Sequence, residues 1–185
     1  MKNVSENPIL IGFSFDKVYI RIMRYLIISF LLIFNINSYA ENQSDQILCL
    51  AKNIYHEARG EEDDGKIAVS NVVINRVNSK NFPSDVCSVV YQRNQIIFID
   101  MILKILPIPA LCQFSWTCDL KPNDSFNDSK SWKSSQKIAK EVFQGLHNDI
   151  TDGATHYYNP DKVSTPSWAK ELQKTKVIGR HHFYK

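Results

Sequence analysis

The chain has 185 residues, of which 44% are hydrophobic and 22% charged, the composition of an ordinary globular protein. This length suits one domain that buries its own core without metals or many disulfides. The formal net charge is +3, and residues 1–40 hold +2 of it through four basic and two acidic side chains. The rest of the chain is nearly neutral and gives no sign of nucleic-acid binding, which usually needs a concentrated basic face.

The first 40 residues have the pattern of an export signal. Arg21 and Arg24 precede an apolar run over residues 25–34, and Ser38-Tyr39-Ala40 offers small residues at the two positions that a signal peptidase inspects. The run is shorter than the roughly 20 apolar residues of a membrane span. We therefore expect a signal peptide over 1–40, cleaved after Ala40, with Met23 as an alternative start. An uncleaved membrane anchor is the competing interpretation.

All four cysteines lie in the expected mature chain, residues 41–185: Cys49, Cys87, Cys112 and Cys118. In an exported protein they are expected to form two disulfides, in one of three connectivities. A zinc site is the alternative, although the sequence has no CxxC pair. The spacing of the cysteines does not determine which of them pair.

Apolar residues at helical spacing predict two helices at the start of the mature chain. The first covers 45–59, with Ser44 or Asp45 as its cap and Gly60 as its stop, and the second covers 64–78. A loop at 81–84 leads into a short helix that begins at Ser84 or Asp85 and includes Val86, Val89 and Val90.

Residues 96–110 form an unusual, almost entirely apolar insert. Only Asp100 and Lys104 interrupt it, spaced as an i,i+4 ion pair on a helix, and Pro107 and Pro109 end it. The insert is interpreted as a buried helix packed on the core. A flap that touches a membrane or covers the substrate, and a sequence artefact, are the alternatives.

The carboxyl-terminal part predicts one more helix and two short strands. An amphipathic pattern covers 131–146, and aromatic-rich segments at 155–158 and 181–184 are typical of strands. Asn159-Pro160 and Ile178-Gly179 supply turns beside them. The expected fold class is α+β, mostly helical, a single domain with a small antiparallel sheet near the carboxyl end.

Glu57 is the leading candidate for acid chemistry. It borders the apolar stripe of Leu50, Ile54 and Ala58, so its carboxyl group should be partly desolvated, which favours the protonated form and raises its pKa. A general acid needs this property near neutral pH. A surface glutamate at a helix end is the alternative. His56-Glu57 also begins like a zinc-protease helix, but Gly60 stands where the second histidine is needed.

Several segments together resemble one family, the cell-wall hydrolases related to the catalytic domain of spore cortex-lytic enzymes. The resemblance extends from about Cys49 to Tyr184 in the family's order. The segments that carry it are 48–51, 54–61, 65–69, 72–77, 82–83, 86–92, 112–116, 153–160, 168–169 and 178–184. The sequence departs from the family mainly at 96–110, where the family is usually polar.

The resemblance implies a lysozyme-like, lytic-transglycosylase-like fold and cleavage of peptidoglycan between N-acetylmuramic acid and N-acetylglucosamine. It places the catalytic acid at Glu57 and implies lytic transglycosylation, in which one group serves as acid and then as base. The family pattern that the sequence resembles requires no metal or cofactor.

Ordinary hydrolysis would usually use a second carboxylate, and Glu61 is the candidate. Because Gly60 is expected to break the helix between them, Glu61 is interpreted instead as ordering the site or raising the Glu57 pKa by like-charge repulsion. A purely structural role is the alternative.

Two segments are expected to line the substrate cleft. Gln113, Ser115 and Trp116 offer an amide, a hydroxyl and an indole to a sugar with N-acetyl groups. The second wall is His156, Tyr157, Tyr158 and Asn159, with one of the two tyrosines expected to reach sugar. A metal held by His156, His181, His182 and Asp152 is a weaker alternative to histidines at a strand edge.

The leading prediction is a monomeric, exported transglycosylase in the periplasm, cell wall or medium. Its partner is peptidoglycan, not nucleic acid, and membrane contact is confined to the signal segment or the 96–110 insert. The alternatives are a hydrolytic muramidase using Glu57 and Glu61, a wall-binding module without turnover, and a metal-dependent amidase.

Overall fold

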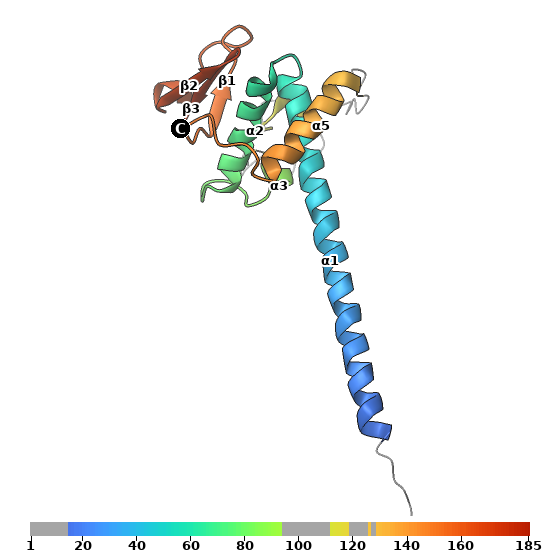
Figure 1. The fold of residues 1–185 in the computed structure, drawn as a ribbon. Coiled ribbons are helices and arrows are strands. Elements are labelled where there is room, and N and C mark those ends of the chain that lie inside the picture. The colour runs from blue at the N-terminus through green and yellow to red at the C-terminus, as the bar shows by residue number, and fades with distance from the viewer. Residues whose placement is uncertain (1–14, 94–111, 119–125, 127–128) are drawn as a thin grey trace, which may run out of the picture. The chain divides into compact units, whose positions relative to one another are not determined.

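A computed structural model describes residues 15–93, 112–118, 126 and 129–185, apart from the side chains of 15–18 and 31–41. The chain divides into two units, residues 1–42 and 43–185, and we describe each by itself. Figure 1 shows the elements in chain order. The apolar insert expected at 96–110 lies outside the described residues.

The first unit contains the amino-terminal part of helix α1, which has the bounds Phe15–Ala58. Neither glycine nor proline occurs between these residues, so nothing in the sequence interrupts the helix. The prediction that a helix begins at Ser44 or Asp45 is therefore wrong. Many apolar side chains between Tyr19 and Phe30 are exposed. Among the described residues, we find no helix with both the length and the apolar character needed to cross a membrane.

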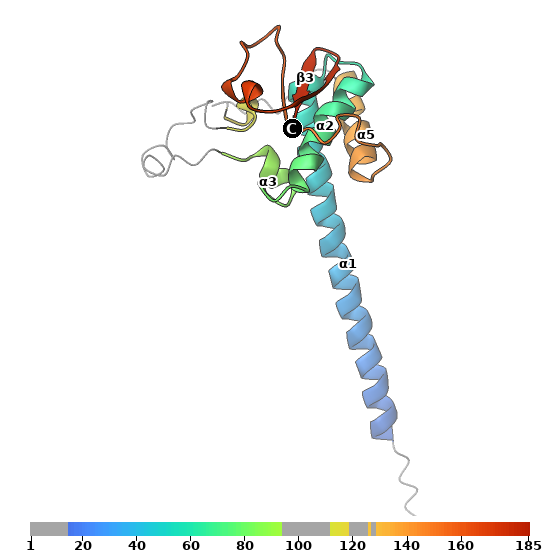
Figure 2. The same cartoon turned by 90° about the vertical axis from the view of Figure 1, so that its left-hand side faces the viewer.

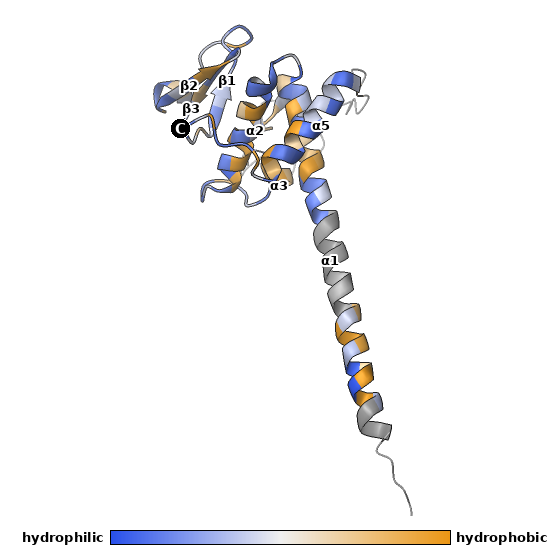
Figure 3. Ribbon diagram, viewed as in Figure 1, coloured by the Kyte–Doolittle hydropathy of each residue, from blue (hydrophilic) through white to orange (hydrophobic). Residues whose placement is uncertain are grey.

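In the second unit, the end of α1 packs with α2 (Asp63–Val77), α3 (Val86–Val90) and α5 (Ser129–Phe143). Helix α2 contacts both α3 (Figure 2) and α5. Leu50, Ile54 and Val73 are among the fully buried residues of the shared core. Figure 3 shows apolar stretches on each of these helices. The predicted helices 64–78, 85–90 and 131–146 are confirmed, with ends that differ by up to three residues.

The carboxyl-terminal sheet is antiparallel, with the order β1-β3-β2. Strand β1 is His156–Tyr158, β2 is Lys174–Ile178 and β3 is His181–Tyr184. The sheet lies beside α2 (Figure 1), and Phe183 of β3 joins Ala68 and Val72 of α2 in a second buried cluster. The two aromatic strands are confirmed, whereas β2 was not predicted. Two short 3-10 helices, η2 (Ser115–Cys118) and η3 (Ser167–Lys170), complete the described elements.

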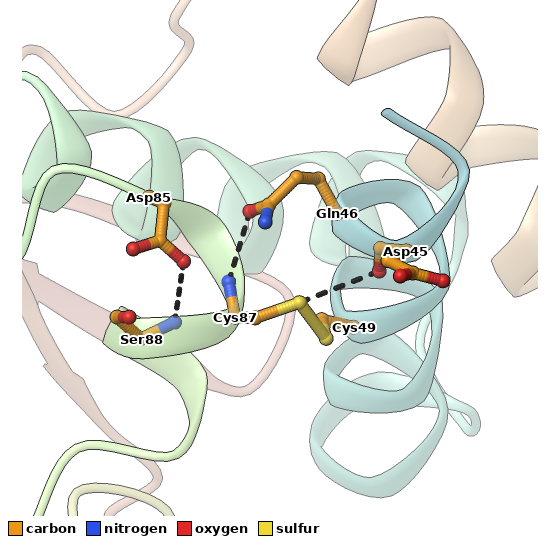
Figure 4. Close-up of a disulfide and its surroundings, with 6 residues drawn as sticks. All are labelled: Asp45, Gln46, Cys49, Asp85, Cys87 and Ser88. Carbon is orange, nitrogen blue, oxygen red and sulfur yellow. Dashed lines mark hydrogen bonds between the residues drawn. A yellow bond between two sulfur atoms is a disulfide. The ribbon is translucent and has the colours of Figure 1, made fainter. Parts of the chain in front are cut away.

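Two disulfides stabilise this unit: Cys49–Cys87 and Cys112–Cys118. The first joins α1 to α3 (Figure 4). There the backbone N–H of Cys87 donates to the Gln46 side chain at 3.1 Å, and the Asp85 carboxylate caps α3 by accepting from Ser88 N–H at 2.8 Å. The expected pair of disulfides is thus confirmed, and the connectivity that the sequence left open is resolved.

Candidate functional site

A pocket of about 420 Å³ lies in the second unit, where α1, α2, the segment around η2, and the sheet converge. Its lining combines one carboxylic acid with basic, amide, hydroxyl and aromatic side chains. The lining residues are His56, Glu57, Arg76, Cys112, Gln113, Phe114, Ser115, Trp116, Tyr157, Tyr158, Asn159, Lys162, Val163 and His181. This mixture suits a polar ligand that carries flat apolar faces, such as a sugar.

Glu57 projects into the pocket from the last turn of α1. The helix ends at Ala58, and Gly60 follows as the sequence predicts. Ile54 and Ala58, its neighbours on the helix, are buried and hold this turn against the core. Burial raises the pKa of Glu57 above its ordinary value, although Tyr157, Lys162 and Arg76 partly offset the rise. Glu57 therefore combines access to the pocket with a carboxyl group whose protonated form is favoured by burial.

Tyr157 and Arg76 reach the same pocket from β1 and α2. The Tyr157 hydroxyl is buried. Among the described residues, no atom lies within hydrogen-bonding geometry of it. It is nevertheless near enough to the Glu57 carboxyl group to influence the pKa of both. Burial, and then the charge of Glu57, raise the pKa of Tyr157 well above its ordinary value, so the hydroxyl stays protonated.

The short loop closed by Cys112–Cys118 supplies one wall, including the predicted residues Gln113, Ser115 and Trp116. Trp116 stacks on His56 with ring centroids 4.4 Å apart, and its indole Nε1 donates to Asn53 of α1 at 3.4 Å. The aromatic wall is thereby attached to the helix that carries Glu57.

Of the four residues predicted for the second wall, three line the pocket: Tyr157, Tyr158 and Asn159. His156 is not part of the lining. Its side chain instead contacts Thr155, Phe82 and Trp168. Burial, with a smaller effect of the Arg76 charge, lowers its pKa.

Glu61 also lies outside the pocket lining, bound to Arg180 in the turn between β2 and β3. Arg180 donates to it through Nε at 2.6 Å and through its backbone N–H at 3.2 Å. Gly179, at φ +55°, permits this approach, because a Cβ there would collide with the Glu61 carboxylate. Burial alone would raise the pKa of Glu61, but the Arg180 hydrogen bonds and charge hold it below its usual range.

The contacts of Glu61 with Arg180 bear on the two roles expected for Glu61, which were to order the site or to raise the Glu57 pKa. It does not raise the Glu57 pKa by like-charge repulsion, because burial is the main cause and Glu61 is not among the groups that act on Glu57. Its carboxylate instead joins the loop after α1 to the sheet, which agrees with an ordering or structural role.

The histidines considered for a metal have other surroundings. His181 lines the pocket, where its ring meets Tyr157 edge-on, and burial lowers its pKa. His182 lies next to Lys174 Nζ, and Asp152 pairs with Lys176. Within the described chain, no three potential ligands from His, Cys, Asp and Glu gather at one point.

Sequence reasoning did not assign roles to Arg76, His56 or Lys162, which also line the pocket. Arg76 stands in a segment that matches the family, so resemblance marked its position without indicating its function. Lys162 is an exposed side chain in a loop, and no sequence pattern distinguishes it.

Comparison with known proteins agrees with this architecture. The spore cortex-lytic enzyme of Bacillus subtilis (strain 168) is 26% identical over 140 residues, which cover 76% of this chain and 37% of that protein. The chain spans less than half the length of the curated relatives it matches.

Two solved structures are similar in both sequence and fold. The catalytic domain of Bacillus cereus SleB shares 28% identity with a TM-score of 0.50, covering 77% of this chain and 91% of that one. The catalytic domain of the germination-specific lytic transglycosylase SleB from Bacillus anthracis also shares 28% identity at a TM-score of 0.50, covering 76% and 93%. The predicted lysozyme-like α+β fold is confirmed.

The family model described as Cell Wall Hydrolase matches residues 60–184. This range contains every residue of the pocket lining except His56 and Glu57, which lie four and three residues before its start. The chain belongs to the cell wall hydrolase family.

Proposed function

We propose that this chain cleaves the glycan strands of peptidoglycan between N-acetylmuramic acid and N-acetylglucosamine, with Glu57 as general acid. The observation that carries the proposal is a carboxyl group of raised pKa in a pocket whose walls suit sugars. Family membership and the similarity to SleB catalytic domains support the choice of peptidoglycan as substrate.

The proposed reaction is lytic transglycosylation. Glu57 gives its proton to the bridging oxygen, and the bond from that oxygen to C1 of the muramic residue breaks. The C6 hydroxyl oxygen of the same sugar then bonds to C1, and its proton passes to the Glu57 carboxylate. The product is a 1,6-anhydro end, and Glu57 returns to its starting state, so one group serves both steps.

The surroundings of Glu57 favour this route over hydrolysis. A hydrolytic glycosidase usually places a second carboxylate at about 5–9.5 Å from the first. Glu57 is the one carboxylic acid among the described residues of the pocket lining, and the Glu61 carboxylate is bound to Arg180. A single acid–base group is what transglycosylation requires.

The test is digestion of purified peptidoglycan, with mass spectrometry of the fragments. The parent protein should release fragments with anhydro ends, one water lighter than reducing ends, and Glu57→Gln should release none. Glu62→Gln is the matched control, because Glu62 is exposed and its side chain makes no capping hydrogen bond. An active Glu57→Gln variant would disprove the role of Glu57. Reducing ends would identify a hydrolytic muramidase, and binding without fragments a wall-binding module.

We also infer that the chain is exported. Two disulfides within one small unit are typical of proteins that fold in an oxidising compartment. Determining the amino terminus of the protein recovered from outside the cytoplasm tests this. It should begin at Glu41 if residues 1–40 are a cleaved signal, and earlier if they are an anchor.

A further inference from the structure

Arg76 is a buried cation beside the pocket. It lies in the last turn of α2 with only 2% of its surface exposed. Burying a guanidinium is costly unless a carboxylate or several hydrogen bonds compensate. Within the described part of the chain, no carboxylate forms an ion pair with it. Packing alone would be served as well by an apolar side chain, so the retained charge requires an explanation.

Neutral groups hold the guanidinium in one place. Nε donates to the Thr155 carbonyl oxygen at 2.7 Å, and the rings of Phe82 and Phe114 lie 5.2 and 5.4 Å from its central carbon. When the Gln113 amide is oriented with its oxygen toward Arg76, it accepts from both terminal nitrogens at 3.1 Å. These contacts fix the position of the charge without neutralising it.

Glu57 lines the same pocket as Arg76 and senses its charge, as Tyr157 also does. The effect is mutual, since Arg76 stabilises the ionised form of Glu57 and the Glu57 charge favours the protonated form of Arg76. Burial lowers the pKa of Arg76 to about 10, so it remains a cation at neutral pH. Five other titratable groups line the pocket around Glu57, among them Tyr158 on β1. The other four are His56 on α1, Tyr157 on β1, Lys162 in the loop after β1, and His181 on β3.

We propose that Arg76 is a positioning residue for the proposed acid Glu57, a fixed cation in the same pocket that stabilises its carboxylate once the proton has been transferred. This inference rests on the proposed function. In a water-poor pocket, a charge already in place stabilises a developing anion more than water could, because it need not reorient during the reaction. Lys162 also lines the pocket and lowers the pKa of Glu57 more than Arg76 does, but its side chain is exposed, so that solvent and salt screen its charge.

The primary test compares Arg76→Met, Arg76→Lys and the parent. The Glu57 carboxyl is titrated by carbon-13 NMR, with its signal assigned by its absence from Glu57→Gln. Arg76→Met should raise the pKa of Glu57 beyond the scatter of replicate titrations, and Arg76→Lys should leave it near the parental value. Arg59→Met is the matched control, because it removes an exposed cation two residues from Glu57 that does not line the pocket.

Kinetics supply a second readout. In Arg76→Met, the alkaline limb of the pH profile should move to higher pH. Its kcat should fall roughly tenfold to a hundredfold even where Glu57 is fully protonated, because a less stabilised carboxylate is a weaker acid. If Arg76 had a purely structural role, Arg76→Met would lower the activity without moving the alkaline limb of the pH profile. A folded Arg76→Met variant with the parental titration and profile would overturn the inference.

If Arg76→Met does not fold, Gln113→Glu tests the same point with Arg76 still present. The new carboxylate would pair with the guanidinium and cancel its charge, so the pKa of Glu57 should rise. Ser115→Glu is the control for the added negative charge, since Ser115 is exposed on the same wall. An equal shift in both variants, or none in Gln113→Glu, would overturn the inference. Failure of the proposed function is separate, because it would appear as an active Glu57→Gln variant.

Discussion

The two disulfides should have different roles, one in stability and the other in activity. Cys49–Cys87 closes a loop with a sequence separation of 38 and joins α1 to α3, both part of the main core. Cys112–Cys118 closes a loop with a separation of 6, which carries the pocket wall. The entropy that a disulfide removes from the unfolded chain grows with the logarithm of loop length.

The chain-entropy relation gives about 4 kcal/mol for the larger loop and about 2 kcal/mol for the smaller one. Replacing both cysteines of a pair with alanine should therefore lower the free energy of unfolding about twice as much for Cys49–Cys87. The small loop should matter more for activity. Its start is also held by Gln113 N–H, which donates to the Gln92 carbonyl oxygen at 2.9 Å, whereas the disulfide fixes its other end.

The assay combines urea denaturation with digestion of purified peptidoglycan below the unfolding transition. We expect the Cys112/Cys118 variant to lose about tenfold or more in kcat/KM while it keeps most of its stability, because small displacements in a site are costly. The Cys49/Cys87 variant should show the opposite pattern. Equal losses of stability in the two variants, or full activity without Cys112–Cys118, would refute the reasoning.

Three further substitutions test the packing and electrostatics. Phe183→Ala should lower the free energy of unfolding by about 3–5 kcal/mol in urea denaturation, because the ring is fully buried between the sheet and α2. Glu61→Gln should cost only about 1 kcal/mol, and less in high salt, because half of its partner Arg180 is exposed. Glu57→Gln should stabilise the fold at neutral pH by about 1.4 kcal/mol for each unit by which folding raises the Glu57 pKa. Thermal melts should show this gain vanishing below the ordinary Glu57 pKa of 4.5, where the carboxyl is protonated in both states.

Local sequence patterns predicted α2, α3 and α5 well but not the start of α1, because apolar residues at helical spacing mark the part of a helix that packs on the core and not where the helix begins. Strand β2 was missed since Lys174 and Lys176 make it read as a polar loop, and its pairing depends on β3, which comes later in the chain. Lysines suit such an edge strand because they discourage pairing with other chains.

The sequence predicted those site residues whose surroundings are formed by residues close to them in the chain. Glu57 stands out because its own helix supplies the apolar surroundings, and six of the seven expected substrate-binding residues line the pocket with it. Glu61 and Arg76 were not understood, because their partners are distant in sequence. Arg180 lies 119 residues from Glu61, and Thr155 lies 79 residues from Arg76. Only tertiary structure shows that one forms an ion pair and the other is a buried cation.

The position of Glu57 at the end of α1 creates opposing electrostatic demands. Burial disfavours its charged form, and the carbonyl groups at the carboxyl end of a helix also repel a negative charge. Both effects favour the protonated form of Glu57 and so make it a weaker acid. Arg76 and Lys162 oppose them from other parts of the fold. Since only Arg76 is buried and fixed, the strength of the acid should depend on how accurately α2 docks against α1, which connects core packing to the proposed chemistry.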